Sequence, residues 1–458
     1  MKRTDLIWGY SAQLLNIGVG ILLLPILVVT LNSEELGLWY VFMAMVSLAQ
    51  LLEFGFQPTI ARQAAYIYNG ATEIKRSGLP ATVSGELNID LLVNLIHSSK
   101  YIYRWIAILV AVLLWGMGSL YIYTLNYAGD PTTAYMSWFL FASASVITFY
   151  FGYFNALLQG RGDITLVNKV VVASRVSYVL LAIVLLLLKL SLLAIAIASL
   201  ISCIINRILI SRAFYNAKSR GFKKNKPTAN LNKVLWANTW RLGLVQFGAF
   251  LIQRGNMFIA ATYLGLSVAA SYGLTMQLSA IIVTLANQLM ALQLPKMNAL
   301  QAACEKNELK NIYASSVLVA FILLISGFAA LILLGEPILA LIGSETKLIN
   351  SHMLALLGLV LLLETHHSIS ATYLTTTNQV PFLKAALVSG VGVTLFSFAL
   401  VYWGGLGVTG LIIGQGLVQL CFNNWYWPKV AMQHLNITPL ELASRGYKSI
   451  TQMLVKQS

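Results

Sequence analysis

Twelve long apolar segments divide this sequence, and almost all of its basic residues lie on one side of them. If the first segment begins in the cytoplasm, the loops and ends on that side hold twenty-four of the thirty Lys and Arg residues. The opposite side holds only Lys189 and Lys347, and the other four are arginines within segments or at their ends. Positive charge resists translocation across an energised membrane, so this bias predicts a membrane protein with both termini in the cytoplasm.

The composition agrees with this interpretation. Hydrophobic residues make up 58% of the chain and charged residues only 10%, against about 25% charged residues in a soluble domain. A net charge of +15 would suggest nucleic acid binding in a soluble protein. Here the orientation signal accounts for it, so we expect no nucleic acid partner.

The segments have the length of membrane-spanning helices, which need roughly 20 apolar residues each. They cover residues 7–31, 38–60, 103–125, 134–158, 170–188, 191–211, 238–263, 268–293, 313–335, 349–373, 384–403 and 408–427. Six precede a long basic loop and six follow it. The predicted fold class is all-α transmembrane, with twelve helices in two six-helix lobes.

The basic loop at the midpoint sets the predicted domain limits. It carries seven basic residues and no acidic residue, a charge that serves orientation and attraction to anionic lipid, or regulation. We expect an N-terminal lobe, a cytoplasmic linker, a C-terminal lobe and a cytoplasmic tail over residues 1–211, 212–235, 236–428 and 429–458.

Two amphipathic stretches outside the spans predict helices at the membrane surface. In the loop after the second span, apolar residues recur at helical spacing, at Leu87, Leu91, Leu92, Leu95 and Ile96. In the tail, Thr438 and Glu441 form a capping box with Pro439 at the first helical position. The tail helix then has one apolar face, which consists of Leu440, Ala443, Tyr447, Ile450 and Leu454.

Pro25 and Pro58 lie within the first two spans. Because proline removes a backbone donor and clashes with the preceding turn, we expect a kink or a break at each. Breaks in spans free backbone groups where helices line a cavity.

Arginine within the apolar segments is the strongest functional signal. Arg254 lies near the middle of the seventh span, beside Gln253 and Asn256. A charge at this depth costs several kcal/mol unless it meets water, a partner or a ligand. Two interpretations stay open: an ion pair inside the helix bundle, and a cavity for substrate or water.

The other embedded arginines lie closer to the inner surface. Arg175 is about 9 Å inward from Lys169 by helical rise, so its side chain either faces a cavity or extends back to the interface. Arg207 and Arg241 lie nearer the inner ends of their spans, and we expect both to reach the interface.

Two acidic residues are embedded as well. Glu53 lies in the second span and Glu364 in the tenth, where His366 and His367 follow it. A carboxylate in a low-dielectric site can exchange a proton or hold a sodium ion, which suits an ion-coupled transporter. The alternative is that each acid only balances an embedded arginine.

Aromatic and amide side chains could contact sugars. Tyr150 and Tyr153 lie in a ring-rich stretch near the inner end of the fourth span. Such rings suit the membrane interface, and they also stack on sugar faces. Gln253 and Asn256, which flank Arg254, are the other candidates for sugar contacts.

No group of residues in the sequence has the arrangement of an enzyme active site. It has no Gly-rich phosphate loop, no paired-cysteine metal site and no Ser/His/Asp set on one water-exposed surface. The predicted outer loops are short, which argues against a glycan polymerase or ligase. We therefore expect no enzymatic activity, no cofactor beyond a coupling H⁺ or Na⁺, and an anionic cargo for the arginines, such as a phosphate-bearing lipid.

The N-terminal third carries a recognisable pattern. Residues 35–40 read Glu-Leu-Gly-Leu-Trp-Tyr, residues 51–62 read Leu-Leu-Glu-Phe-Gly-Phe-Gln-Pro-Thr-Ile-Ala-Arg, and Tyr66 and Gly70 follow. This pattern resembles the start of O-antigen flippases of the Wzx type. They belong to the multidrug/oligosaccharidyl-lipid/polysaccharide exporter superfamily.

The resemblance implies a V-shaped fold of two lobes that opens alternately to each side of a bacterial inner membrane. It implies a cargo of undecaprenyl-pyrophosphate-linked oligosaccharide, ion-coupled antiport, and contacts with membrane lipids and other polysaccharide-assembly membrane proteins. By this analogy Arg62, Arg175 and Arg254 are the pyrophosphate candidates, and only Arg62 matches the pattern itself. Related lipid II flippases carry charges in the first span, which this chain lacks.

Two rivals remain open. A cation-coupled multidrug exporter of the same superfamily would prefer an acidic lumen, whereas this chain embeds arginines. A membrane-embedded glycan polymerase or ligase is the alternative of another class.

Overall fold

The computed structural model describes residues 3–53, 55–74, 87–215, 227–303, 305–377 and 382–455. Over these ranges the chain is helical and contains no strand. Nine helical stretches within them are long and apolar enough to cross a membrane. The chain is therefore an all-helical, multi-pass membrane protein, and the full set of twelve spans stays a prediction. The chain forms two compact units, Met1–Phe247 and Gly248–Ser458. The boundary between them lies within the helix that runs from Asn232 to Ile259.

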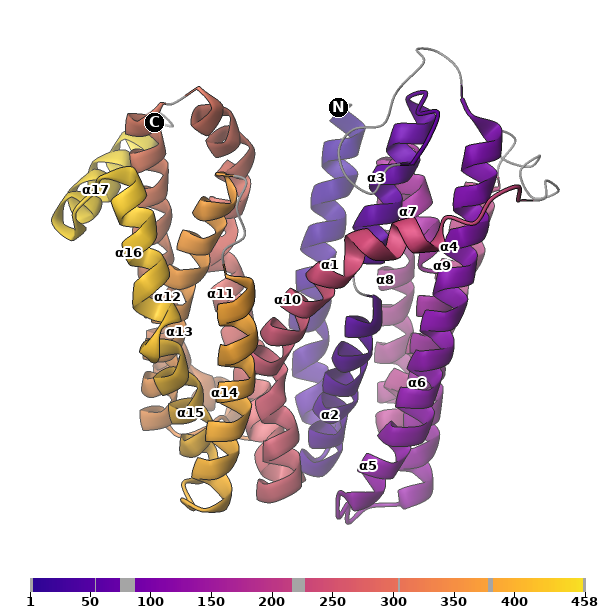
Figure 1. The fold of residues 1–458 in the computed structure, drawn as a ribbon. Helices are drawn as coiled ribbons and strands as arrows, with labels where there is room; N and C mark the ends of the chain where they lie inside the picture. The colour runs from indigo at the N-terminus through magenta and orange to yellow at the C-terminus, as the bar shows by residue number, and fades with distance from the viewer. Residues whose placement is uncertain are drawn as a thin grey trace. The chain divides into compact units, whose positions relative to one another are not determined.

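The described residues of the first unit form a series of α-helices that ends with the start of a longer one (Figure 1). They are α1 (Arg3–Thr30), α2 (Ser33–Gln50), α3 (Phe56–Tyr68), α4 (Ile89–Ala111), α5 (Ser119–Thr124), α6 (Pro131–Tyr150), α7 (Tyr153–Gly160), α8 (Ile164–Leu187), α9 (Ser191–Phe214) and the start of α10 (Asn232–Ile259). Helix α8 packs against α1 and α9, α6 packs against α4 and α9, and α3 packs against α7.

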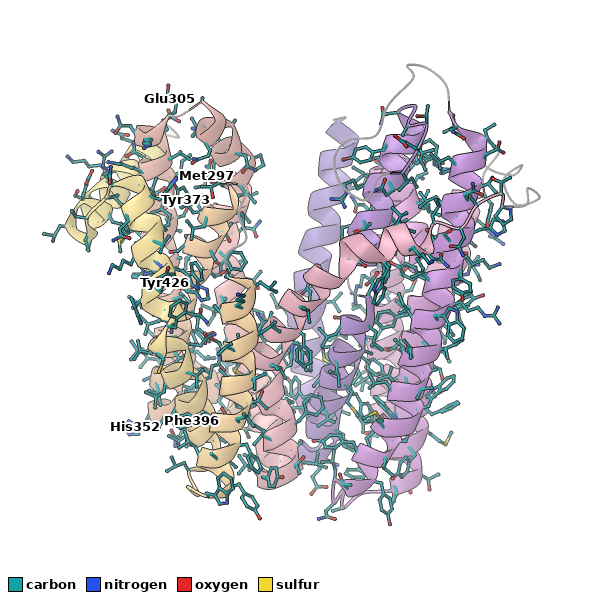
Figure 2. The ribbon with its side chains drawn as sticks, viewed as in Figure 1. Met297, Glu305, His352, Tyr373, Phe396 and Tyr426 are labelled. Atoms are coloured by element: carbon teal, nitrogen blue, oxygen red, sulfur yellow. The ribbon has the colours of Figure 1, made fainter. Side chains whose placement is uncertain are left out.

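The second unit begins within α10 and contains the remaining helices. They are α11 (Leu266–Ala302), α12 (Lys306–Leu341), α13 (Ser351–Thr375), α14 (Leu383–Tyr402), α15 (Gly407–Cys421), α16 (Asn423–Leu435) and α17 (Pro439–Val455). Helix α12 packs against α11, α13 and α17, and α14 packs against α15. Within this unit, Figure 2 shows Glu305 at one end of the helices and His352 and Phe396 at the other.

Side-chain caps explain where several helices begin. Asn32, Asn88, Asp130 and Asn350 each precede a helix in an extended conformation and accept a hydrogen bond from its first turn. A short polar side chain at this position satisfies backbone donors that the helix itself cannot pair. At Asn32 the cap is reciprocal, because the Glu35 carboxylate also accepts from the Asn32 backbone N–H.

The outer surfaces of the helices are apolar. Leu120, Leu333 and Leu395 are each at least 63% exposed, in three different spans. A soluble protein rarely exposes so many large apolar side chains over contiguous surface. These side chains therefore face lipid, as the composition predicts.

Some predicted spans are not single helices. The second divides into α2, a 3-10 turn at Leu51–Glu53 and α3, and the fourth divides into α6 and α7. Gly55 precedes α3 with φ of 76°, a left-handed conformation that glycine adopts freely. The break thus follows the 3-10 turn and precedes α3 at Gly55, and Pro58 lies in the first turn of α3, where proline is tolerated. Helix α1 continues through Pro25.

The prediction of a separate surface helix over residues 87–96 is wrong. These residues start α4, and Leu92, Leu95 and Ile96 are buried. The reason is a tertiary contact: the backbone N–H of Thr228 donates to the Asn94 side chain at 2.8 Å, and that of Leu231 donates to the Ser98 hydroxyl at 3.0 Å. The chain leading into α10 therefore packs against this segment at Asn94 and Ser98.

The predicted tail helix is present as α17, and its start agrees with the capping box. The Glu441 backbone N–H donates to the Thr438 hydroxyl at 3.2 Å. Arg445 bonds to Glu441 and to Asn311 of α12, and this bond from Arg445 lowers the pKa of the Glu441 carboxyl. The polar side of α17 thus docks on α12, and Leu440 and Tyr447 on the apolar face stay exposed.

Gly160 allows α7 to lie directly against α3. A Cβ at this position would lie 2.5 Å from the Ala61 carbonyl oxygen, closer than real contacts allow. We predict that Gly160→Ala lowers the thermal unfolding midpoint of the detergent-purified protein, because overpacking costs about 1–3 kcal/mol. Gly116→Ala is the control, since a Cβ there meets nothing within 4 Å. Equal midpoints for both variants would contradict this close packing.

Candidate functional site

Each unit buries a cluster of polar side chains between its spans. In the first unit the cluster lies where α2–α3 and α6–α7 break. The Tyr103 hydroxyl on α4 donates to the Glu53 carboxylate at 2.6 Å. The Tyr103 ring is fully buried, packs against Tyr153 with ring centroids 6.2 Å apart, and lies against Gly152. One tyrosine therefore joins both breaks, and broken spans commonly mark binding sites in transporters.

Tyr150 and Tyr153 lie at the α6–α7 break. Tyr153 is buried, whereas Tyr150 is half-buried beside Phe151. Their contact with sugars stays a prediction, and of the two Tyr150 has the more accessible ring.

Arg62 and Arg175 are exposed in the first unit. Arg62 lies on α3, beyond the break, and Arg175 lies about 16 Å along α8 from Ile164 by helical rise. An exposed guanidinium in the middle of so apolar a helix needs water, a ligand or a partner, because contact with lipid would be costly.

The polar cluster of the second unit centres on Glu364 of α13. Gln415 on α15 donates to both carboxylate oxygens, at 2.9 and 3.1 Å. One turn further, Gln419 accepts a bond of 2.7 Å from Asn423, whose side chain also bonds to Ser389 and Trp427. A continuous chain of polar groups therefore runs from Glu364 along α15 into α16.

Several buried groups beside this chain have no partner within the described residues. They are the Thr365 hydroxyl, the His366 Nε2 atom and both amide atoms of Asn424. Buried polar groups are nearly always satisfied in native proteins, so such a concentration indicates water, an ion or a ligand. His366 itself packs edge-on against the ring of Phe321.

Arg254 lies near the same cluster. Gln253 and Arg254 are exposed on α10, whereas Asn256 is buried and donates to the Leu411 carbonyl of α15 at 3.1 Å. Tyr272 on α11 interacts with Asn256, Arg254 and Glu364. The residues predicted for substrate and ion on α10 and α13 therefore belong to one neighbourhood.

Neither embedded acid forms an ion pair in the part of the chain that the structure describes. Glu53 accepts from Tyr103 and Glu364 from Gln415, and the ion pairs found there join Arg161 to Asp163 and basic residues to Glu308 or Glu441. Nor do the described residues contain a group of three His, Cys, Asp or Glu side chains able to hold a metal ion. The interpretation that each acid balances an arginine thus finds no support in these contacts.

The sequence prediction missed the partners of these acids. Gln415, Gln419 and Asn423 recur every four residues in an apolar segment, a spacing that places them on one helix face. That pattern could have identified the chain around Glu364. Nothing in the sequence pairs Tyr103 with Glu53, because the contact depends on how α4 packs.

Sequence comparison places this architecture in a known family. A family model described as "Polysaccharide biosynthesis protein" matches residues 3–301. The chain belongs to this family. The resemblance of its N-terminal pattern to polysaccharide exporters is thereby confirmed. No curated protein matches the chain in sequence.

Solved structures show the same fold as this polysaccharide biosynthesis family member. An inward-facing multidrug resistance MATE family transporter of the MOP superfamily matches with a TM-score of 0.69 over 93% of this chain and 95% of that chain, at 16% identity. The MATE multidrug transporter DinF-BH matches with 0.63, over 97% of both chains at 14% identity. The lipid II flippase MurJ, inward closed, matches with 0.62 over 99% and 92% at 13% identity.

The three neighbours are described as transporters or a flippase, and at 13–16% identity they show the fold alone, which is MATE-like and helical.

Gln415 should be energetically coupled to Glu364. We predict that Gln415→Leu destabilises the purified protein by about 1–3 kcal/mol, because a buried carboxylate loses its donors. In combination with Glu364→Gln the cost should be non-additive by about 0.5 kcal/mol or more. Thermal unfolding of the single and double variants measures this, with the exposed Gln433→Leu on α16 as control. Additive costs would show that the two side chains do not interact.

Proposed function

We propose that this protein is a flippase for undecaprenyl-pyrophosphate-linked oligosaccharide, an O-antigen repeat unit. It moves its cargo from the inner to the outer leaflet of the bacterial inner membrane by alternating access. The observation that carries the proposal is the presence of exposed arginines within apolar helices of a member of a polysaccharide biosynthesis family.

The arginines support an anionic cargo. Arg175 presents an exposed guanidinium from the middle of α8, which is long and apolar enough to cross a membrane, and Arg254 presents one from α10, in the predicted seventh span. Guanidinium keeps its charge at depth and pairs bidentately with phosphate oxygens. Arg62, on the short helix after the first break, is the third candidate, and the amide groups of Gln253 and Asn256 beside Arg254 suit sugar hydroxyls.

The acids support ion coupling. Glu364 has hydrogen-bond donors but no cationic partner among the described residues, and its chain neighbours Thr365 and His366 each have a buried polar atom without a partner there. Such a carboxylate can take up and release a proton or a sodium ion during a transport cycle. Glu53 and His366 are the other candidates for this role.

Two competitors are weaker. Multidrug transporters are among the structural neighbours, but a drug cation would be repelled by exposed arginines in the spans. The lipid II flippase MurJ has a similar fold, but the charges expected for that cargo are missing from the first span. A glycan polymerase is a further alternative, which the family and the neighbours do not favour.

Arg254 should be essential for transport. We predict that Arg254→Ala abolishes surface polysaccharide in a strain that lacks its own native copy of this flippase, whereas wild type restores it. Arg254→Lys should retain part of the activity, because lysine keeps the charge but not the bidentate geometry.

Arg212→Ala, an exposed arginine in the last turn of α9, is the matched control. Full activity of Arg254→Ala at normal membrane levels would remove this residue from the site. If wild-type protein is correctly inserted in the membrane but does not restore surface polysaccharide, the proposed cargo is wrong. Drug-efflux assays would then be the next experiment.

The two embedded acids should differ in importance. Glu364 belongs to an extended polar chain, whereas Glu53 has a single tyrosine partner. We therefore predict that Glu364→Gln and Glu53→Gln reduce polysaccharide export to different degrees in the same strain. Two silent substitutions would exclude coupling through a carboxylate.

A further inference from the structure

Arg207 of α9 packs against two aromatic rings, a contact that its position in the sequence does not predict. Its guanidinium carbon lies 3.5 Å from the centre of the Phe151 ring and 4.6 Å from that of Phe154. Phe151 ends α6 and Phe154 lies in the first turn of α7. The charge is therefore held by two rings at the α6–α7 break, about 10 Å along the helix from its end at Phe214.

Arg161, a second arginine near the same rings, provides a comparison, because its contacts are all within the chain. Arg161 lies over Phe214, whose ring contacts that of Phe154 at 5.3 Å. Arg161 is paired with Asp163 and donates to the carbonyls of Ala213 and Phe214 at 3.1 and 3.2 Å. The Asp163 carboxylate therefore balances the charge of Arg161, and backbone carbonyls accept hydrogen bonds from its guanidinium.

Arg207 has no such partners within the described ranges. No carboxylate there pairs with it, and its Nη1 atom is buried without a hydrogen-bond acceptor. On α7, the Oδ1 atom of Asn155 is likewise buried and unpaired. A buried N–H of a charged group that lacks an acceptor is costly, and such groups commonly meet water, an ion or a ligand.

Three phenols complete the surroundings. Tyr150, Tyr153 and Tyr215 interact electrostatically with the Arg207 guanidinium. Tyr150 and Tyr215 are half-buried, so they border a region that a ligand can approach. Hydroxyl groups can donate to an oxyanion, and the rings of such residues stack on sugar faces.

We propose that the Arg207 cluster, made of Arg207, Phe151, Phe154, Tyr150 and Tyr215, is a binding site for a phosphate or pyrophosphate group that carries a sugar or prenyl substituent. The rings hold the guanidinium plane, and its Nε and Nη2 atoms, which unlike Nη1 are not found buried, can meet phosphate oxygens. The site rests on the proposed function, since it receives the anionic part of the same cargo. It lies at the end of the spans predicted to be cytoplasmic, so it takes the cargo before translocation.

The test measures binding rather than transport. Full-length protein in nanodiscs of neutral lipid is titrated calorimetrically with inorganic pyrophosphate and with farnesyl pyrophosphate, in wild type, Arg207→Gln and Arg207→Lys. We expect both probes to bind wild type, and Arg207→Gln to lose at least tenfold in affinity. Arg207→Lys should lose several-fold, because lysine cannot present two parallel donors. Arg212→Ala, an exposed arginine of the same helix, should stay within twofold.

The two probes separate the sources of the anion. Tighter binding of farnesyl pyrophosphate assigns the site to a lipid headgroup, and equal binding assigns it to the free anion. Wild-type affinity for both probes in folded Arg207→Gln would overturn the site. If Arg207→Gln unfolds, Phe151→Leu removes a ring while keeping the charge, and unchanged affinity there and in Arg207→Lys would overturn it equally.

Failure of this site and failure of the proposed function give different results. If wild type restores polysaccharide but Arg207→Gln binds normally, only the site is wrong. If Arg207→Gln loses binding but wild type does not restore polysaccharide, the anion site stands and the cargo is different.

Discussion

The hydrocarbon core of a bilayer offers no hydrogen-bond partner, and the rest of this structure depends on that constraint. A regular helix satisfies the hydrogen bonds of its own backbone. A span can therefore break only where side chains or close packing replace the backbone hydrogen bonds that are lost. Two breaks occur in the first unit, one after the 3-10 turn at Leu51–Glu53 and one at Phe151–Gly152, and Tyr103 contacts both. The same constraint makes each embedded charge costly. An ionisable side chain inside a span is therefore a candidate for a functional role.

The two units solve the problem of a buried acid in the same chemical way. Each surrounds a carboxylate with neutral donors, a tyrosine hydroxyl for Glu53 and a glutamine amide for Glu364, and not with a cation among the described residues. A strong ion pair would hold such an acid in one charge state. Neutral donors stabilise the carboxylate less, which leaves it free to change its proton or counter-ion as the surroundings change.

Local signals in the sequence predicted those features that depend on neighbouring residues alone, namely apolar helices and helix starts. Apolar length located the nine stretches that are long and apolar enough, among the described residues, to cross a membrane, and the capping box located the start of α17 at Pro439. The position of a break was less accessible: Pro58 pointed to the second span, but the left-handed glycine at Gly55 sets the break three residues earlier. Packing between distant segments was out of reach. Nothing in the sequence reveals that residues 227–231 cover the start of α4, that Tyr103 meets Glu53, or that two rings hold Arg207.

The close contact of α3 with α7 has a mechanical consequence. Both helices follow a break in a membrane span, and Gly160 lets their backbones touch without a side chain between them. A shift of either helix would therefore carry the other with it. Arg62 lies on α3, and α7 carries Phe154, whose ring contacts the Arg207 guanidinium of α9. A shift of α3 would thus reach α9 through two packing contacts, although the three helices lie far apart in the sequence.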